Sequence, residues 1–124
     1  AEQARLEQYV GQRLSSPSEH LLVVEDGKDL LGFVHVILEP VLQALSVPFR
    51  HGVIEGWIQH IIVDSRHRRQ GVGRALDAAA HDWARAQGAE TVGLQVWAYN
   101  ADAERFFERL GYQPRTARLY RPCA

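Results

Sequence analysis

Residues 66–76, RHRRQGVGRAL, place basic side chains and two glycines directly ahead of a helix-like run. Gly71 and Gly73 have no side chains, so a bulky anion can come close to the backbone at these positions. The first N–H groups of a helix lack acceptors within the helix, and the helix dipole favours negative charge there. The stretch therefore predicts a phosphate or pyrophosphate site, with a solvated arginine-rich turn as the alternative.

Two common phosphate-binding patterns do not fit this stretch. A P-loop needs Gly-Lys followed by Ser or Thr, and the glycines here are not followed in that way. The dinucleotide fingerprint of Rossmann folds needs a small residue where Leu76 stands, and a tight turn where this chain has a basic insert. The counter-charges are instead arginines, which suit phosphate oxygens. The candidates are Arg68, Arg69 and Arg74, with Arg66 and His67 able to reach a more distant phosphate.

The apolar pattern predicts a strand before this stretch and a helix after it. Residues 57–63 (WIQHIIV) are apolar enough for an interior strand of a sheet. From Val72 to Trp83 apolar residues recur every three or four positions, and Gly88 is placed to end the helix. The glycines are thereby predicted to open a helix that packs on the sheet.

The other expected elements complete a mixed α/β domain that spans residues 1–124. The spacing of Leu6, Val10 and Leu14 predicts a short first helix, which the proline in SSPS would end. The remaining expected elements are strands at 21–25 and 30–38 joined by an Asp-Gly turn, a strand at 91–97, a helix at 101–110 that ends at Gly111, and a weak strand at 117–121.

The composition restricts the class of protein. The chain has 124 residues, 46% of them hydrophobic and 23% charged, and a formal net charge of −1. These values indicate one globular domain, and the neutral balance argues against a general nucleic-acid binder. The only cysteine, Cys123, cannot form an internal disulfide. No apolar run approaches the roughly 18 residues of a membrane helix and no signal peptide opens the chain, so a cytoplasmic protein without a membrane partner is expected.

The spacing Arg68-x-x-Gly71-x-Gly73 resembles the acetyl-CoA signature, Q/R-x-x-G-x-G/A, of the GNAT acyltransferase superfamily. The stretch 61–89 looks like the family's central strand, pyrophosphate loop and following helix. NADAERFFERLGYQ, residues 100–113, is similar to its asparagine-led helix with an aromatic pair and a final GF or GY. The resemblance implies acetyl-CoA (coenzyme A) as cofactor. It also implies a single acyl-CoA N-acyltransferase domain, in which helices flank a central, mostly antiparallel sheet.

Two departures from the family pattern limit what the resemblance implies. The family's usual first strand and helix are expected to be missing, and this part commonly helps to form the acceptor pocket. Phe107 stands where many members have a tyrosine that protonates the departing thiolate. Because a thiol with a pKa of about 8.5 can leave as a thiolate at modest cost, this loss is tolerable.

The resemblance assigns cofactor contacts to three parts of the chain. The pantetheine arm is expected beside the strand at 57–63, bonded to backbone near Ile61 and Val63, with an N–H near Ile62 or Val63 for the oxyanion. Asn100 is expected to bind the same arm, with a helix N-cap as the alternative. The full set is Ile61, Ile62, Val63, Arg68, Arg69, Gly71, Val72, Gly73, Arg74, Asn100 and Phe107.

The chemistry also needs a base, because a lysine-type amine has a pKa of about 10.4 and is mostly protonated at neutral pH. Glu55 stands two residues before Trp57. With regular alternation it shares its strand face with Gln59, Ile61 and Val63, and that face would run toward the thioester. His60 has a suitable intrinsic pKa but points to the opposite face unless a bulge turns it. Both stay candidates, against a surface carboxylate and a packed histidine. His35 is a possible neighbour of His60, but two histidines make a poor metal site.

The leading hypothesis is an acetyl-CoA-dependent N-acetyltransferase that acts on a primary amine of a small molecule or a protein. One alternative is a non-catalytic acyl-CoA sensor with the same fold, and another is a small nucleic-acid-binding module that uses residues 66–74. The sequence allows a homodimer, without a feature that decides it.

Overall fold

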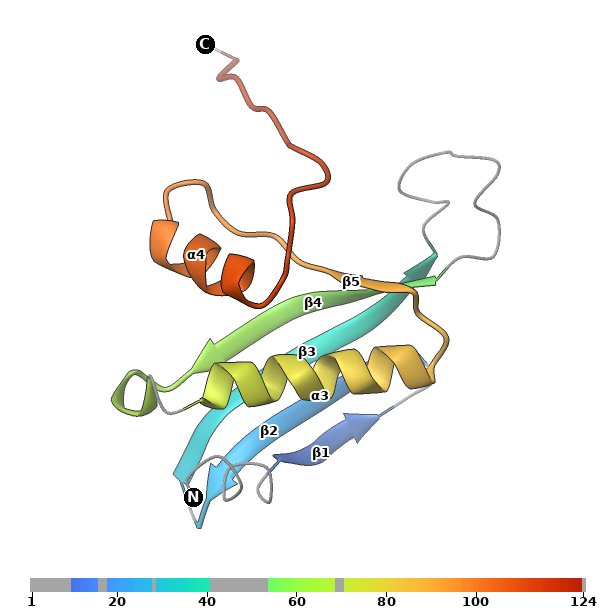
Figure 1. Cartoon of the computed structure of the whole chain (residues 1–124), viewed down its shortest axis with the longest axis vertical. Helices are drawn as coiled ribbons and strands as arrows, with labels where there is room; N and C mark the ends of the chain where they lie inside the picture. Colours follow the sequence, from blue (N-terminus) through green and yellow to red (C-terminus); the bar gives the residue numbers. More distant parts are fainter. Residues whose placement is uncertain (1–9, 16–17, 28, 41–53, 69–70, 124) are drawn as a thin grey trace. The chain divides into compact units, whose positions relative to one another are not determined.

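The computed structural model describes residues 10–15, 18–27, 29–40, 54–68 and 71–123 (Figure 1). By its contacts the chain divides into two compact units, Ala1–Leu94 and Gln95–Ala124, and each is described by itself. The expectation of one domain over 1–124 stays a prediction.

The first unit is built on a five-stranded sheet whose strands follow one another in chain order. The antiparallel strands are β1 (Val10–Ser15), β2 (Glu19–Asp26), β3 (Asp29–Pro40) and β4 (Ile54–Val63), and β5 (Thr91–Gly93) pairs with β4 in parallel. The expected mixed fold with a mostly antiparallel sheet is therefore confirmed. The β2–β3 hairpin turns at Gly27, which has a φ of 64° that an L-residue rarely adopts.

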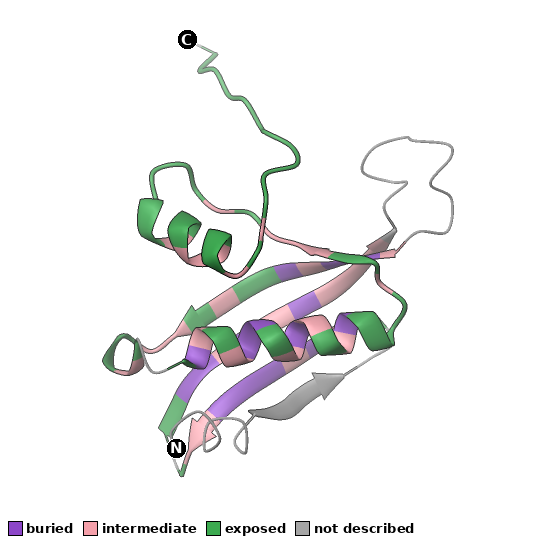
Figure 2. Ribbon diagram, viewed as in Figure 1, coloured by how far each residue is buried: buried purple, intermediate pink, exposed green. Residues whose placement is uncertain are grey.

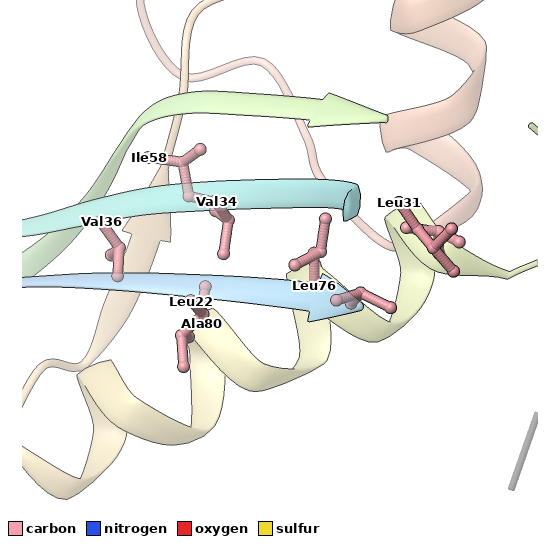
Figure 3. Packing of buried hydrophobic residues seen from close by; sticks show 9 residues of the cluster. Leu22, Leu31, Val34, Val36, Ile58, Leu76 and Ala80 are labelled. Atoms are coloured by element: carbon pink, nitrogen blue, oxygen red, sulfur yellow. The ribbon is translucent and has the colours of Figure 1, made fainter. Parts of the chain in front are cut away.

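The helix α3 (Val72–Ala86) lies across one face of the sheet, as Figure 1 shows. Its buried stripe alternates with exposed positions in Figure 2, as expected for a helix with one apolar face. Gly88, with a φ of 97°, follows the helix as the spacing predicted. The core between helix and sheet (Figure 3) consists of Leu22, Val24, Leu31, Val34, Val36, Ile58, Val72, Leu76 and Ala80.

Three expected elements differ from the structure. Val10 and Leu14 lie in strand β1 and not in a helix, while Leu6 falls outside the described residues. Apolar spacing alone does not exclude a strand, and pairing with β2 decides the outcome, with a register shift between Gln12 and Leu14. The strand expected at 91–97 ends at Gly93, and no strand forms at 117–121, where Tyr120 is exposed.

The second unit contains α4 (Ala101–Arg109), which ends before Gly111 as predicted. Asn100 caps the helix: its side-chain oxygen accepts a hydrogen bond from Ala103 N at 3.2 Å. The Phe107 ring meets Tyr112 edge to face, with ring centroids 5.6 Å apart. Among the helices in the described ranges, none is long and apolar enough to cross a membrane.

Candidate active site

A short connection joins β4 to α3 and carries the predicted anion site. Asp64 N donates to Leu31 O of β3 at 2.8 Å, and a 3₁₀ turn at Ser65–His67 follows. Gly71 then begins α3 as its N-cap with a φ of 82°, a conformation that favours glycine. The sequence therefore places a glycine where the backbone reverses into the helix.

The N-terminal turn of α3 directs backbone N–H groups out of the helix end. Ala75 N donates to Gly71 O at 3.0 Å, so the preceding N–H groups of Val72, Gly73 and Arg74 have no acceptor within the helix. No acidic residue lies in this turn, so no side chain there competes with a bound anion. The Val72 side chain is 1% exposed and belongs to the core. Only the backbone of Val72 can therefore serve the predicted cofactor contact.

The arginines around this turn differ in what they can offer to an anion. Arg68 and Arg74 are exposed, whereas Arg69 falls outside the described residues. Arg66 is paired with Asp64: its Nη2 lies 2.9 Å from one carboxylate oxygen, and its backbone N donates to the other at 2.9 Å. Arg66 thus holds the turn together, and Arg68 and Arg74 are the described cations best placed for phosphates.

The Asp64–Arg66 pair stabilises the turn only above a certain pH, which can be measured. Hydrogen bonds from the Arg66 side chain and backbone lower the pKa of Asp64 from 3.8 to about 2. Because this folded-state pKa is depressed, the stabilisation is complete above pH 3.8 and is lost as the pH falls through about 2. We expect the Asp64 carboxyl carbon to titrate by NMR with a midpoint near 2, and with a higher midpoint in Arg66→Gln, where the side-chain bond is lost and the backbone bond stays. A midpoint near 3.8 in the wild-type chain would contradict the pairing.

A bulge in β4 changes which residues share a face. His60 pairs with His35 of β3 and Ile58 pairs with Val36, so Gln59 is an extra residue without a partner in β3. Ile58 belongs to the core under α3, and Ile61 packs against that core. The prediction that Glu55 shares a face with Ile61 and Val63 is therefore wrong, because the extra residue interrupts the alternation.

The face of the sheet that is turned away from α3 is called the far face. It is defined by Glu55, Trp57, His60 and Ile62 of β4 together with His35 of β3. The bulge turns His60 onto this face, so both candidate bases lie on the same side of the sheet. Glu39 of β3 pairs with Glu55 and belongs to the same face. The far face therefore carries carboxylates and imidazoles around aromatic and aliphatic side chains.

Glu55 is buried, with 7% of its surface exposed, so it is no surface carboxylate. Its Oε2 accepts a hydrogen bond from Thr91 Oγ1 of β5 at 3.3 Å. Gly93 leaves room for the Trp57 ring, because a Cβ there would lie 3.0 Å from Trp57 Cζ3. The start of β4 is thus closely packed against β5.

The later half of β4 has a different neighbourhood. In the described part of the chain, the ladder between β4 and β5 ends at the pair Trp57–Gly93, whereas β4 stays paired with β3 up to Val63. Asp64 N points toward β3, and alternate residues of a strand direct their N–H groups to opposite sides. Ile61 and Val63 therefore direct theirs away from β3, while Ile62 directs its N–H toward β3. Among the predicted backbone donors, this geometry favours Ile61 and Val63.

His60 and His35 lie opposite each other on the far face, as the sequence allowed. Their ring centroids are 6.3 Å apart with an angle of 10° between the planes. His35 Nε2 lies 3.0 Å from Glu19 Oε1 of β2. The described residues contain no group of three or more His, Cys, Asp or Glu side chains that could hold a metal ion.

Two predicted residues belong to the second unit. The Oδ1 of Asn100 is used in the helix cap, so the N-cap alternative is observed for this atom. Phe107 contacts Phe106 edge to face, with ring centroids 5.1 Å apart. The candidate bases, the predicted backbone donors of β4 and the glycine turn all belong to the first unit.

The comparisons with known proteins agree on one family. The ribosomal protein bS18-alanine N-acetyltransferase of Escherichia coli K12 is 39% identical over 64 residues, covering 52% of this chain and 43% of that protein. The aminoglycoside N(6′)-acetyltransferase type 1 of Klebsiella aerogenes is 33% identical over 89 residues, covering 69% and 53%. Each match therefore covers about half, or less, of the curated relative's own length.

The solved structures agree as well. A putative acetyl transferase from Pyrococcus furiosus superposes with a TM-score of 0.73 at 28% identity, covering 84% of this chain and 65% of that one. The sequence profile of the Acetyltransferase (GNAT) family matches residues 1–112. With most of its length inside that profile, the chain belongs to the GNAT acetyltransferase family.

Proposed function

We propose that this protein is an N-acetyltransferase that moves an acetyl group from acetyl-CoA to a primary amine. The observation that carries the proposal is the path of β4. Beyond Trp57 this strand leaves its ladder with β5, and the short connection after Val63 joins it to the glycine turn at the start of α3. One continuous segment can therefore offer backbone N–H groups first to an amide-containing arm and then to a diphosphate.

The residues present fit coenzyme A at both ends of this segment. The N–H groups at 72–74 and the exposed Arg68 and Arg74 would hold the phosphates, and the lack of a side chain at Gly73 leaves the backbone accessible. Ile61 and Val63 would bond the pantetheine arm, and the Val63 N–H is our choice for the oxyanion donor. When bound, acetyl-CoA supplies the acetyl group as a thioester. Asn100, Arg69 and Phe107 stay proposed contacts on the family resemblance alone.

The acceptor amine is proposed to approach over the far face. An ammonium group must lose a proton before it can attack a carbonyl, so a base has to lie within reach. Glu55 and His60 occupy this face on either side of the bulge. Since the named relatives act on a ribosomal protein and on aminoglycosides, the acceptor class proposed here is a primary amine of a protein or a small molecule. A cytoplasmic location and a homodimer stay predictions from the sequence.

Acetyl-CoA should raise the thermal stability of the chain. Ligand at about 100 times its dissociation constant stabilises a folded protein by about 2.7 kcal/mol if it does not bind the unfolded chain. The melting temperature should therefore rise in a concentration-dependent way with acetyl-CoA. An oligonucleotide should leave the melting temperature unchanged. The alternative, a nucleic-acid-binding module that uses residues 66–74, predicts a rise with the oligonucleotide instead. A shift with the oligonucleotide and none with acetyl-CoA would refute the proposal.

Turnover separates an enzyme from an acyl-CoA sensor of the same fold. Release of free thiol from acetyl-CoA should accelerate with at least one amine among spermidine, an aminoglycoside and a peptide with an N-terminal alanine. A chain that binds acetyl-CoA but releases no thiol with any of these amines would instead be assigned as a sensor.

A further inference from the structure

Glu19, His35 and His60 form a row across β2, β3 and β4 on the far face. Glu19 and His35 are joined at 3.0 Å between Oε1 and Nε2, and the His60 ring lies nearly parallel to His35 on the next strand. The side chains of His35 and Glu19 are 26% and 41% exposed. The pair is therefore partly shielded and still open to a small molecule, whereas Glu55 is almost fully buried.

The hydrogen bond to Glu19 decides which nitrogen of His35 carries the proton. An ionised carboxylate only accepts hydrogen bonds, so Nε2 of His35 must donate. In the neutral ring Nδ1 then keeps its lone pair and can accept a proton. With that proton the ring is a cation hydrogen-bonded to the Glu19 carboxylate, the same arrangement as histidine and aspartate in a catalytic triad.

We propose that His35, oriented by Glu19, is the base that deprotonates the acceptor amine. This inference rests on the proposed acetyltransferase function and assigns the base to a residue other than Glu55 or His60. His60 lies at the bulge, opposite His35, so the two rings border the same part of the far face. Glu19 is a positioning residue, because it acts through His35.

The proton balance of the transfer is complete with these groups. The acceptor ammonium gives one proton to Nδ1 of His35 and becomes a free amine with a lone pair. The N–C bond of the amide forms and the C–S bond of the thioester breaks, so that the electron pair leaves with sulfur. The acceptor nitrogen loses a second proton, which is transferred to that sulfur and gives the free thiol. His35 then returns its own proton to water. No oxidant or metal ion is needed.

The protonation of His35 can be read without any turnover. Two-bond ¹⁵N–¹H correlation spectra of the whole chain distinguish the two neutral tautomers of a histidine. We expect neutral His35 as the Nε2–H tautomer in the wild-type chain, with a larger share of Nδ1–H in Glu19→Leu. His81, on α3 at 3.6 Å from Asp77, serves as the reference ring and should not respond. A wild-type His35 in the Nδ1–H form would overturn the proposal whatever the activity.

Kinetics test the role of the base. With the best amine of the panel, His35→Ala should lower kcat about 10²- to 10⁴-fold, the usual contribution of a general base, with an unchanged KM for acetyl-CoA. Added imidazole should restore part of the rate, which a purely structural loss would not allow. Glu19→Gln should lose less in the same direction, and His81→Gln should be normal.

Three outcomes would overturn the assignment. His35→Ala could retain its kcat while Glu55→Gln or His60→Ala loses it, which would make one of those residues the base. The loss in His35→Ala could come with a lower melting temperature and no response to imidazole, which would show a structural role. If the wild-type chain releases no thiol with any amine, the acetyltransferase proposal itself is refuted. The tautomer measurement would still test the Glu19–His35 pair.

Discussion

Gly73→Glu should abolish the binding of acetyl-CoA and leave the fold intact. The new carboxylate would stand in the first turn of α3, where the N–H groups at 72–74 are proposed to meet the diphosphate. A negative charge about 4 Å from a phosphate opposes it by about 4 kcal/mol at an effective dielectric constant of 20, which corresponds to about a thousandfold in affinity. The same carboxylate favours the helix, because a negative charge near its N-terminus contributes about 0.3–1 kcal/mol.

The control for this variant is Ala78→Glu. Ala78 is exposed on the same helix, so the substitution adds the same charge away from the glycine turn. Calorimetric titration with acetyl-CoA should give no measurable heat of binding for Gly73→Glu and a normal affinity for Ala78→Glu. Equal affinities in the two variants would remove the diphosphate from this turn.

Gly32→Ala should destabilise the fold and weaken the site together. A Cβ at Gly32 would lie 2.7 Å from the backbone oxygen of Ile62, 3.0 Å from Val72 Cγ1 and 3.1 Å from Leu76 Cδ1. The backbone of β4 cannot move aside as a flexible side chain can, so overpacking of about 1–3 kcal/mol is expected in the free energy of unfolding. Because Val72 and Leu76 hold the start of α3 against the sheet, acetyl-CoA affinity should fall as well.

Gly88→Ala is the control that separates the loss of stability from the loss of acetyl-CoA affinity. Gly88 has a φ of 97° and no atom within 4 Å of a Cβ placed there, so alanine would cost stability through backbone strain alone. It follows the opposite end of α3 from the glycine turn. Chemical denaturation should show a loss for both variants, and only Gly32→Ala should also lose affinity at temperatures where both are folded. Wild-type stability in Gly32→Ala would show that β3 and β4 separate more easily than their packing indicates.

The parts of the fold that the sequence predicts well depend on local chemistry. An Asp-Gly pair between apolar runs marks the β2–β3 hairpin, and Gly88 and Gly111 end their helices because only glycine adopts those positive φ values readily. The turn before α3 can be predicted for the same reason. Its glycines and arginines are consecutive, so the chemistry can be recognised before the fold is known.

The parts that the sequence does not predict depend on pairing between strands. Val10 and Leu14 have a helical spacing, and only pairing with β2 shows that they lie in a strand. The extra residue at Gln59 has no marker in the sequence, so regular alternation predicts the wrong face for the residues beyond it. The Glu19–His35 contact joins residues 16 positions apart, and only the register of β2 against β3 brings them together. Local patterns therefore locate the cofactor turn, whereas the acceptor side requires the sheet.

The early end of the ladder between β4 and β5 has a consequence for self-association. A strand edge with unused N–H and C=O groups is a template to which another chain can add a strand. Ile61 and Val63 direct their N–H groups away from β3, toward the edge where the pantetheine arm is proposed to bind. Cofactor and a neighbouring chain would then compete for the same hydrogen bonds. Bound acetyl-CoA would thus keep another chain from pairing with this strand edge, in addition to supplying the acetyl group.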